Sequence, residues 1–174
     1  MVARPIDSST LLDQFINAFP CEEPRFERKF RLRISDGYIV ETHLHNLGFS
    51  PVYNSRNVNS NYFDTDDCQF ARENINGERY RVKPRLRWYG DQKLTNDIEV
   101  FLEYKFRDAF LGYKYKTKII KPLSNYQHVS SIVENDLFLT VSPSIQTGYV
   151  RRYFQHNSGV RATIDTNLFA RNLR

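Results

Sequence analysis

The sequence predicts an α+β fold, in which antiparallel strands form a β-barrel with flanking helices. Three observations favour it. Apolar and charged residues alternate strictly over several segments, which is typical of strands with one buried and one polar face. Turn signals such as Gly90-Asp91 and Asn157-Ser158-Gly159 join neighbouring segments, as expected of hairpins. The aromatic fraction is 14%, and aromatic side chains favour half-buried pleated surfaces.

The expected elements follow the chain in order. We predict strands over Arg25–Ile34, Val58–Asp64, Arg79–Trp88, Ile98–Phe110, residues 113–119, Gln146–His156 and Val160–Leu168. Helices are predicted over Leu11–Phe19, Ser35–Leu47 and from Ser124 to about Asn135, and a helical turn over Asp66–Glu73.

The 174 residues suffice for a single core, so we divide the chain into an N-terminal helical segment, 1–24, and one main domain, 25–174. No segment has the ~20 apolar residues that a membrane-spanning helix needs. Cys21 and Cys68 lack the spacing of a zinc or redox motif. Two reduced thiols in a cytoplasmic protein are therefore expected.

The basic residues are distributed in a way that points to an anionic ligand. The formal net charge is +5. The charged positions of four predicted strands carry Arg25, Lys29, Arg31, Arg33, Arg79, Arg81, Lys83, Arg85, Arg87, Lys105, Arg107, Lys114, Lys116 and Lys118. In a single strand this could be an ordinary solvated face. Across paired strands, however, like charges oppose each other and destabilise the sheet. Their accumulation favours a polyanion held on the concave, inward side of a barrel.

The few acids on the same faces are Glu27, Glu99 and Glu103. Carboxylates beside phosphate-binding bases can hold Mg²⁺ or Mn²⁺, so Glu27 and Glu103 are candidate metal ligands. The alternative for both is an ion pair with neighbouring bases. A glycine-rich phosphate loop and a nucleophile elbow are absent from the sequence.

Several motifs resemble the VTC domain of the triphosphate tunnel superfamily. They are Asn61-Tyr62-Phe63-Asp64-Thr65, Arg72-Glu73, the run from Gly77 through Lys83-x-Arg85-x-Arg87-Trp88-Tyr89-Gly90, Phe101-Leu102-Glu103-Tyr104-Lys105, Tyr149-x-Arg151-x-Tyr153 and Arg161-x-Thr163-x-Asp165-Thr166-Asn167. The similarity extends from about Arg25 to Leu168.

The resemblance implies an eight-stranded tunnel that transfers the terminal phosphate of a nucleoside triphosphate to polyphosphate, with a divalent metal, Mn or Mg. It implies that Lys29, Arg85, Arg87, Lys105, Lys118, Arg151 and Arg161 are tunnel bases and Tyr149 a polar contact, with Lys83 on the same face. We assign catalytic roles to Lys29, Arg85, Arg87 and Lys105. We assign substrate-binding roles to Arg31, Lys83, Lys116, Lys118, Tyr149, Arg151 and Arg161.

In the family, a further strand with a Glu-x-Lys-type motif follows the strand that ends at Asn167-Leu168, and its glutamate is a principal metal ligand. We therefore expect a tunnel that lacks one or more strands, completed by further sequence or by a partner chain. Three functions stay open: a polyphosphate polymerase, a non-catalytic module that binds polyphosphate or inositol polyphosphates, and an RNA-binding β domain. The RNA-binding function is disfavoured because the aromatic residues lie on the opposite parity from the bases.

Overall fold

A computed structural model describes residues 13–14, 17, 22–95, 98–119 and 126–174 of the chain. The elements are β1 (Glu22–Arg25), the 3-10 helix η1 (Ile34–Asp36), α2 (Gly37–Asn46), β2 (Phe49–Asp64), α3 (Gln69–Asn76), β3 (Tyr80–Tyr89), β4 (Val100–Asp108), β5 (Leu111–Ile119), α4 (Tyr126–Leu137), β6 (Ser142–His156) and β7 (Arg161–Asn172). Most of the predicted helix Leu11–Phe19 lies outside the described residues.

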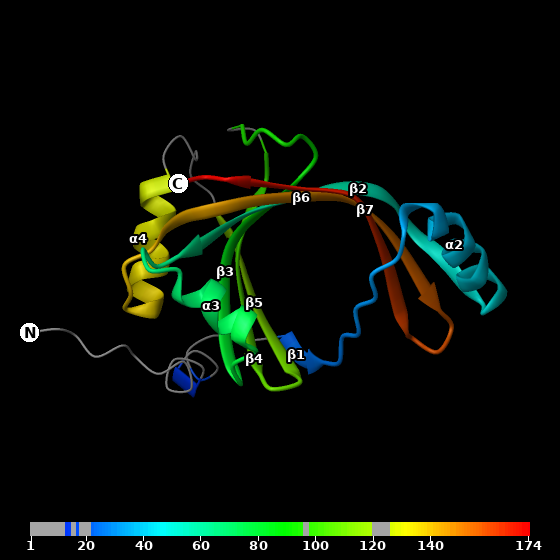
Figure 1. The fold of residues 1–174 in the computed structure, drawn as a ribbon, viewed down its shortest axis with the longest axis horizontal. Helices are drawn as coiled ribbons and strands as arrows, with labels where there is room; N and C mark the ends of the chain where they lie inside the picture. The colour runs from blue at the N-terminus through cyan, green and yellow to red at the C-terminus, as the bar shows by residue number, and fades with distance from the viewer. Residues whose placement is uncertain (1–12, 15–16, 18–21, 96–97, 120–125) are drawn as a thin grey trace, which may run out of the picture.

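The strands form one antiparallel sheet of seven strands in the order β1-β5-β4-β3-β2-β6-β7. Figure 1 shows that it bends strongly, with β3, β4 and β5 as one wall and β2, β6 and β7 arching away from it. Among the described strands, β1 and β7 are the two edges and do not pair with each other. The α+β class with an antiparallel sheet is therefore confirmed. The sheet is open, so closure into a barrel stays a prediction.

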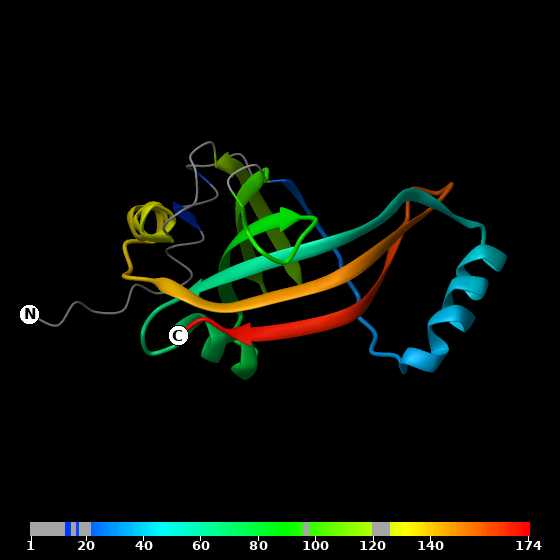
Figure 2. The same cartoon turned by 90° about the horizontal axis from the view of Figure 1, so that it is seen from above.

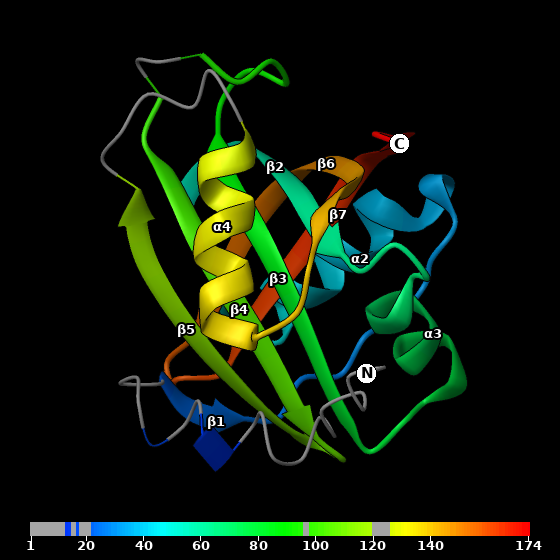
Figure 3. The ribbon, with the colours of Figure 1, turned by 90° about the vertical axis from the view of Figure 1, so that its left-hand side faces the viewer.

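The hydrophobic core lies on one face of the β3–β4–β5 wall. Alternate residues of β3 and β4, including Leu86, Trp88, Leu102 and Tyr104, have no measurable exposure. Helix α4 covers this face, as Figure 3 shows, and Val129, Val133 and Leu137 join the same cluster. Because successive side chains of a strand alternate between faces, this packing directs the odd-numbered side chains of β3 and β4 to the opposite face.

A short connection places α3 beside the ends of β2 and β3. The buried carboxylate of Asp64 accepts hydrogen bonds from the backbone N–H groups of Thr65, Phe70 and Ala71, at 2.9–3.0 Å. It therefore satisfies the free donors at the start of α3, the role usually taken by an N-cap residue. Phe70 anchors the helix in the core.

The long strands β2 and β6 extend beyond the core towards α2. They pair over the length of β2, from Phe49 opposite His156 to Asp64 opposite Ser142, with register shifts on the way. Figure 2 shows α2 at the far end of these strands. This helix buries none of its residues, so the helix predicted over Ser35–Leu47 forms but does not enter the main core.

One predicted strand is wrong. The segment predicted as Arg25–Ile34 is a strand only up to Arg25, in β1, and residues 26–33 are neither strand nor helix. The physical reason is that alternation sets only which side a residue faces, whereas a strand also needs a partner for its backbone groups. Phe26 and Phe30 are 82% and 79% exposed, so this segment does not bury its apolar side chains as a half-buried strand would.

Candidate functional site

Opposite the α4-covered core, the wall formed by β3, β4 and β5 carries a dense set of charges. We call this surface the basic face and define it by Arg81, Lys83, Arg85, Arg87, Glu103, Lys105, Arg107, Lys114, Lys116 and Lys118. The backbone register places like charges directly opposite each other. Lys83 pairs with Lys105, which pairs with Lys114, and Arg81 pairs with Arg107. The predicted coincidence of charged faces on these three strands is therefore present.

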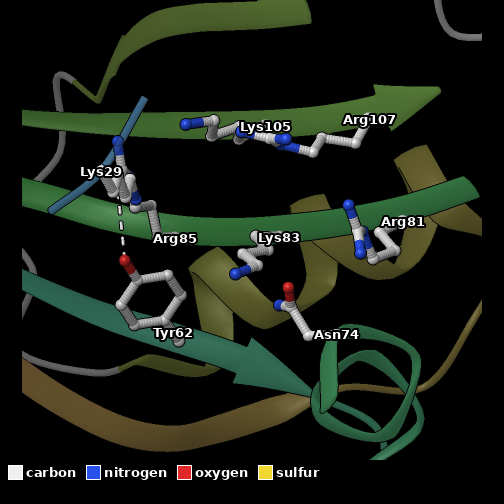
Figure 4. Close-up of a pocket in the computed structure, with 8 residues that line it drawn as sticks. All are labelled: Lys29, Tyr62, Asn74, Arg81, Lys83, Arg85, Lys105 and Arg107. Atoms are coloured by element: carbon white, nitrogen blue, oxygen red, sulfur yellow. Dashed lines mark hydrogen bonds between the residues drawn. The ribbon is translucent and has the colours of Figure 1, made fainter. Parts of the chain in front are cut away.

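A small pocket of about 80 Å³ opens on the basic face, and six of the eight residues that line it are Lys or Arg. They are Lys29, Tyr62, Asn74, Arg81, Lys83, Arg85, Lys105 and Arg107. Figure 4 shows that β3 and β4 supply most of them, Tyr62 comes from β2 and Asn74 rises from α3. Lys29 reaches the pocket from residues 26–33, although this segment is not a strand.

Glu103 neutralises the end of the basic face that lies nearest to β2. Its carboxylate accepts hydrogen bonds from Arg85 Nε at 3.0 Å and Nη2 at 2.8 Å. Arg87 and Lys114 lie 3.6 and 3.2 Å from its oxygens. Burial opposes ionisation of Glu103, but these three positive charges hold its pKa below the usual range.

Two tyrosine hydroxyls extend this network across the sheet. Arg85 Nη1 donates to the Tyr62 hydroxyl at 3.1 Å, and Arg87 Nη2 donates to the Tyr149 hydroxyl at 3.1 Å. Arg87 also donates to Ser60 Oγ at 3.3 Å. These contacts fix the two guanidinium groups in position before a ligand arrives.

The centre of the pocket has far less negative charge. Glu27 accepts a hydrogen bond from Lys105 at 2.7 Å and lies 3.7 Å from Arg107. Lys83 forms no ion pair or side-chain hydrogen bond with any residue that the structure describes. Burial, with the nearby charges of Lys29, Lys105 and Arg81, lowers the pKa of Lys83 to about 8. A lysine held in this way is stabilised by an anion beside it.

The other predicted site residues lie outside the pocket. Lys116 sits 3.5 Å from the centre of the Phe101 ring, and Lys118 forms an exposed ion pair with Glu99 at 2.6 Å. Arg151 is held by Asp165 through two contacts of 2.7 Å on β6 and β7. Arg31 and Arg161 are exposed, in the segment after β1 and at the start of β7. The basic residues are thus divided between one pocket and several separate positions.

Sequence reasoning assigned no role to four of the lining residues. Arg81 and Arg107 were on the charged parity of their strands, so a signal for them existed. Tyr62 was part of a motif that resembles the VTC domain, but no role was assigned to it. Nothing in the sequence pointed to Asn74, because no contact between its helix and β3 was predicted.

The expected metal does not fit the acids that the structure describes. Within these residues, no group of three His, Cys, Asp or Glu side chains is placed to hold an ion. Glu103 is 1% exposed and surrounded by Arg85, Arg87 and Lys114, which would repel a cation. Glu27 is paired with Lys105 and Arg107. The arrangement favours the ion-pair alternative for both glutamates.

Fold and site together define an α+β domain with an open antiparallel sheet and a pocket lined by six bases, three of which are paired with Glu27 or Glu103. The model of the VTC domain family matches residues 24–173. The chain therefore belongs to the VTC domain family, a polyphosphate-related family. A comparison with curated proteins gave no match. In the part of the chain that the structure describes, no helix has the length and apolar character needed to cross a membrane.

Proposed function

We propose that this domain binds a polyphosphate chain along its basic face and extends it from a nucleoside triphosphate. The observation that carries the proposal is the opposition of Lys83, Lys105 and Lys114 across three neighbouring strands. Such a row destabilises a sheet unless a negative charge lies over it. A phosphate chain supplies one charge after another along a line, which matches a row of bases better than a single carboxylate does.

The side chains in the pocket suit phosphate oxygens. Arg85 in the pocket, and Arg87 outside it on the same face of β3, present planar forks that bind two oxygens at once. Lys29, Lys83 and Lys105 supply mobile point charges in the pocket. A nucleic acid would also need exposed aromatic rings on which its bases stack. Tyr62 is the one aromatic residue among the pocket's lining residues, and its hydroxyl is occupied by Arg85. These features favour polyphosphate over RNA.

Turnover would be a transfer of one phosphoryl group. A terminal oxygen of the bound polyphosphate attacks the terminal phosphorus of the nucleoside triphosphate. The bond between that phosphorus and its bridging oxygen breaks, and the nucleoside diphosphate leaves with the bond's electron pair. Arg85, Arg87, Lys29 and Lys105 would align the two phosphate groups and stabilise the charge that develops on their oxygens.

A second candidate is a module that binds polyphosphate or inositol polyphosphates without turnover. The acids favour it, because Glu27 and Glu103 are both engaged by bases. Mn²⁺ or Mg²⁺ would supply charge neutralisation at the transferred phosphoryl group in the polymerase. We therefore propose metal dependence as a property to be tested and assign no ligand for it.

The two candidates are separated by incubating the protein with ATP, a short polyphosphate and either Mn²⁺ or Mg²⁺, while ADP release and polyphosphate length are followed. A polymerase releases ADP as the polyphosphate lengthens, and Arg87→Gln lowers the rate more than tenfold, about 1.4 kcal/mol. Polyphosphate binding by calorimetry without ADP release identifies the binding module. If the protein shows neither polyphosphate binding nor ADP release, both candidates are rejected.

A further inference from the structure

Three residues at the outer end of the pocket have been given no individual role above. Arg81 and Arg107 are directly opposed on β3 and β4, and Asn74 belongs to α3. Figure 4 shows Asn74 rising towards Arg81 and Lys83 from the helix side of the pocket. They lie beyond Lys83, on the side away from Arg85 (Figure 4), and Glu103 is the residue of β4 opposite Arg85.

The polar groups of this cluster have few partners among the residues that the structure describes. Arg81 Nε is buried and has no hydrogen-bond partner among the described residues. A buried donor without a partner costs free energy, so its presence in a pocket points to a ligand acceptor. Asn74 makes no side-chain hydrogen bond to any residue in the described ranges. The nearest acid to Arg107 is Glu27 at 3.7 Å, and Lys105 shares it.

The charge of this end therefore differs from that of the Arg85 end. Glu103 and the Tyr62 hydroxyl hold Arg85, with a shortest distance of 2.8 Å to the carboxylate. Arg81 has no comparable contact with any described residue, although it lies on the same strand face four residues away. At a rise of about 3.4 Å per residue, this separation is roughly 14 Å, which is longer than three linked phosphates.

We propose that Arg81, Arg107 and Asn74 form an outer phosphate subsite, which binds polyphosphate longer than a triphosphate as it leaves the pocket towards α3. Two opposed guanidinium groups offer several N–H donors to one phosphate, and the Asn74 amide adds a neutral donor. This subsite rests on the proposed binding of polyphosphate and adds to it a dependence on chain length. Triphosphate is held at the Arg85 end and does not reach it.

The test compares two ligands on matched variants by isothermal titration calorimetry. The ligands are tripolyphosphate and a polyphosphate long enough to span from Arg85 to Arg81. Arg81→Gln should weaken the longer chain roughly five- to tenfold, the effect of one charge-assisted hydrogen bond, and leave tripolyphosphate unchanged. Arg85→Gln should weaken both ligands. Arg79→Gln is the matched control, because Arg79 carries the same charge two residues away but is exposed and paired with Asp108 at 2.7 Å.

Thermal unfolding of each variant checks that it folds, and Asn74→Ala provides a second, milder variant with the same expected selectivity for the longer chain. The subsite is wrong if the longer chain binds Arg81→Gln and Asn74→Ala as tightly as it binds the wild type. It is also wrong if both ligands weaken equally in Arg81→Gln, since Arg81 would then belong to the triphosphate site. A wild-type protein that binds neither ligand rejects the proposed function itself.

Discussion

At the scale of single residues, Glu103 and Lys83 define the electrostatics of the basic face. Glu103 is a buried acid that holds three bases in place. Lys83 is a half-buried base without an acid of its own in the part of the chain that the structure describes. The first arrangement stabilises the folded protein, whereas the second leaves a positive charge for a ligand to neutralise. Loss of the Glu103 charge should therefore lower the stability of the folded protein, whereas loss of the Lys83 charge should weaken ligand binding.

Replacing Glu103 by glutamine should lower the free energy of unfolding by roughly 3–5 kcal/mol, the usual cost of removing one partner from a buried ionic network. Urea unfolding measures it. Glu99→Gln, which breaks the exposed pair with Lys118, is the control and should cost at most about 1 kcal/mol. Tripolyphosphate should raise the melting temperature of Glu103→Gln more than that of the wild type. Equal losses in the two variants would contradict this account of Glu103.

The charge of Glu103 also sets a pH dependence. Because its folded pKa lies below the unfolded value of 4.5, its contribution to stability is complete above that value. The contribution is lost as the pH falls through the folded pKa. Urea unfolding at a series of acidic pH values should therefore show a smaller loss in Glu103→Gln than in the wild type. Parallel losses would show that other carboxylates cause the acid sensitivity.

Lys83 should make phosphate binding sensitive to alkaline pH. Its pKa in the folded protein is about 8, so affinity for tripolyphosphate should fall as the pH rises through this region and the lysine loses its charge. Lys83→Arg stays charged and should flatten the decline, as measured by calorimetry between pH 7 and pH 9.5. The same slope in both proteins would exclude Lys83 from the ligand site.

As the pH rises, the stability of the ligand-free protein should increase, whereas its affinity for tripolyphosphate falls. The folded pKa of Lys83 is below its unfolded value of 10.5, so the unfolded chain binds more protons between about pH 8 and pH 10.5. The contribution of Lys83 to stability therefore rises with pH across this window.

At the scale of elements, the β3–β4 hairpin is the part that sequence predicts best. One face of this hairpin packs under α4 and the other carries the bases. Apolar and charged residues therefore alternate along both strands, and the alternation predicts which face each side chain occupies. The strand predicted over Arg25–Ile34 failed although its residues also alternate, apart from Arg28. Pairing depends on which backbone lies beside a segment, and the residues of the segment do not contain that information.

The pocket was predictable in the same uneven way. The alternation of side chains along the strands placed Lys83, Arg85 and Lys105 on one face, and the structure brings them together. Parity could not assign Asn74, because its position depends on how Asp64 caps α3 and directs the helix towards β3. Nor could it show that Arg151 is held by Asp165, a contact that depends on the register of β6 and β7.

Helix α4 should support the basic face only through the core. Leu137 is fully buried, and Leu137→Ala should destabilise the protein by about 2–5 kcal/mol in urea unfolding. Leu168→Ala is the control, because Leu168 is 71% exposed and its truncation should cost little. Below its unfolding transition, Leu137→Ala should bind tripolyphosphate with nearly wild-type affinity. A large loss of affinity in the folded variant would mean that core and pocket are coupled more closely than the alternation of faces implies.

At the scale of the whole molecule, the sheet separates two tasks. The wall of β3, β4 and β5 combines a core and a basic face, while β2, β6 and β7 extend away towards α2 (Figure 1). The first part carries bases opposed across three neighbouring strands, whereas the described residues of β2 and β6 oppose one such pair, Arg56 and Arg151. The basic face is therefore suited to a linear polyanion, and the bases that define it all lie on β3, β4 and β5.

Thermal unfolding with matched concentrations of phosphate, supplied as tripolyphosphate or as single-stranded RNA, tests this central claim most directly. At about 100 times its dissociation constant, tripolyphosphate should stabilise the protein by about 2.7 kcal/mol and raise the melting temperature by roughly 5–10 °C. RNA should raise it far less, because the pocket lacks exposed rings for stacking. Equal shifts from the two ligands, or no shift from tripolyphosphate, would contradict a basic face built for polyphosphate.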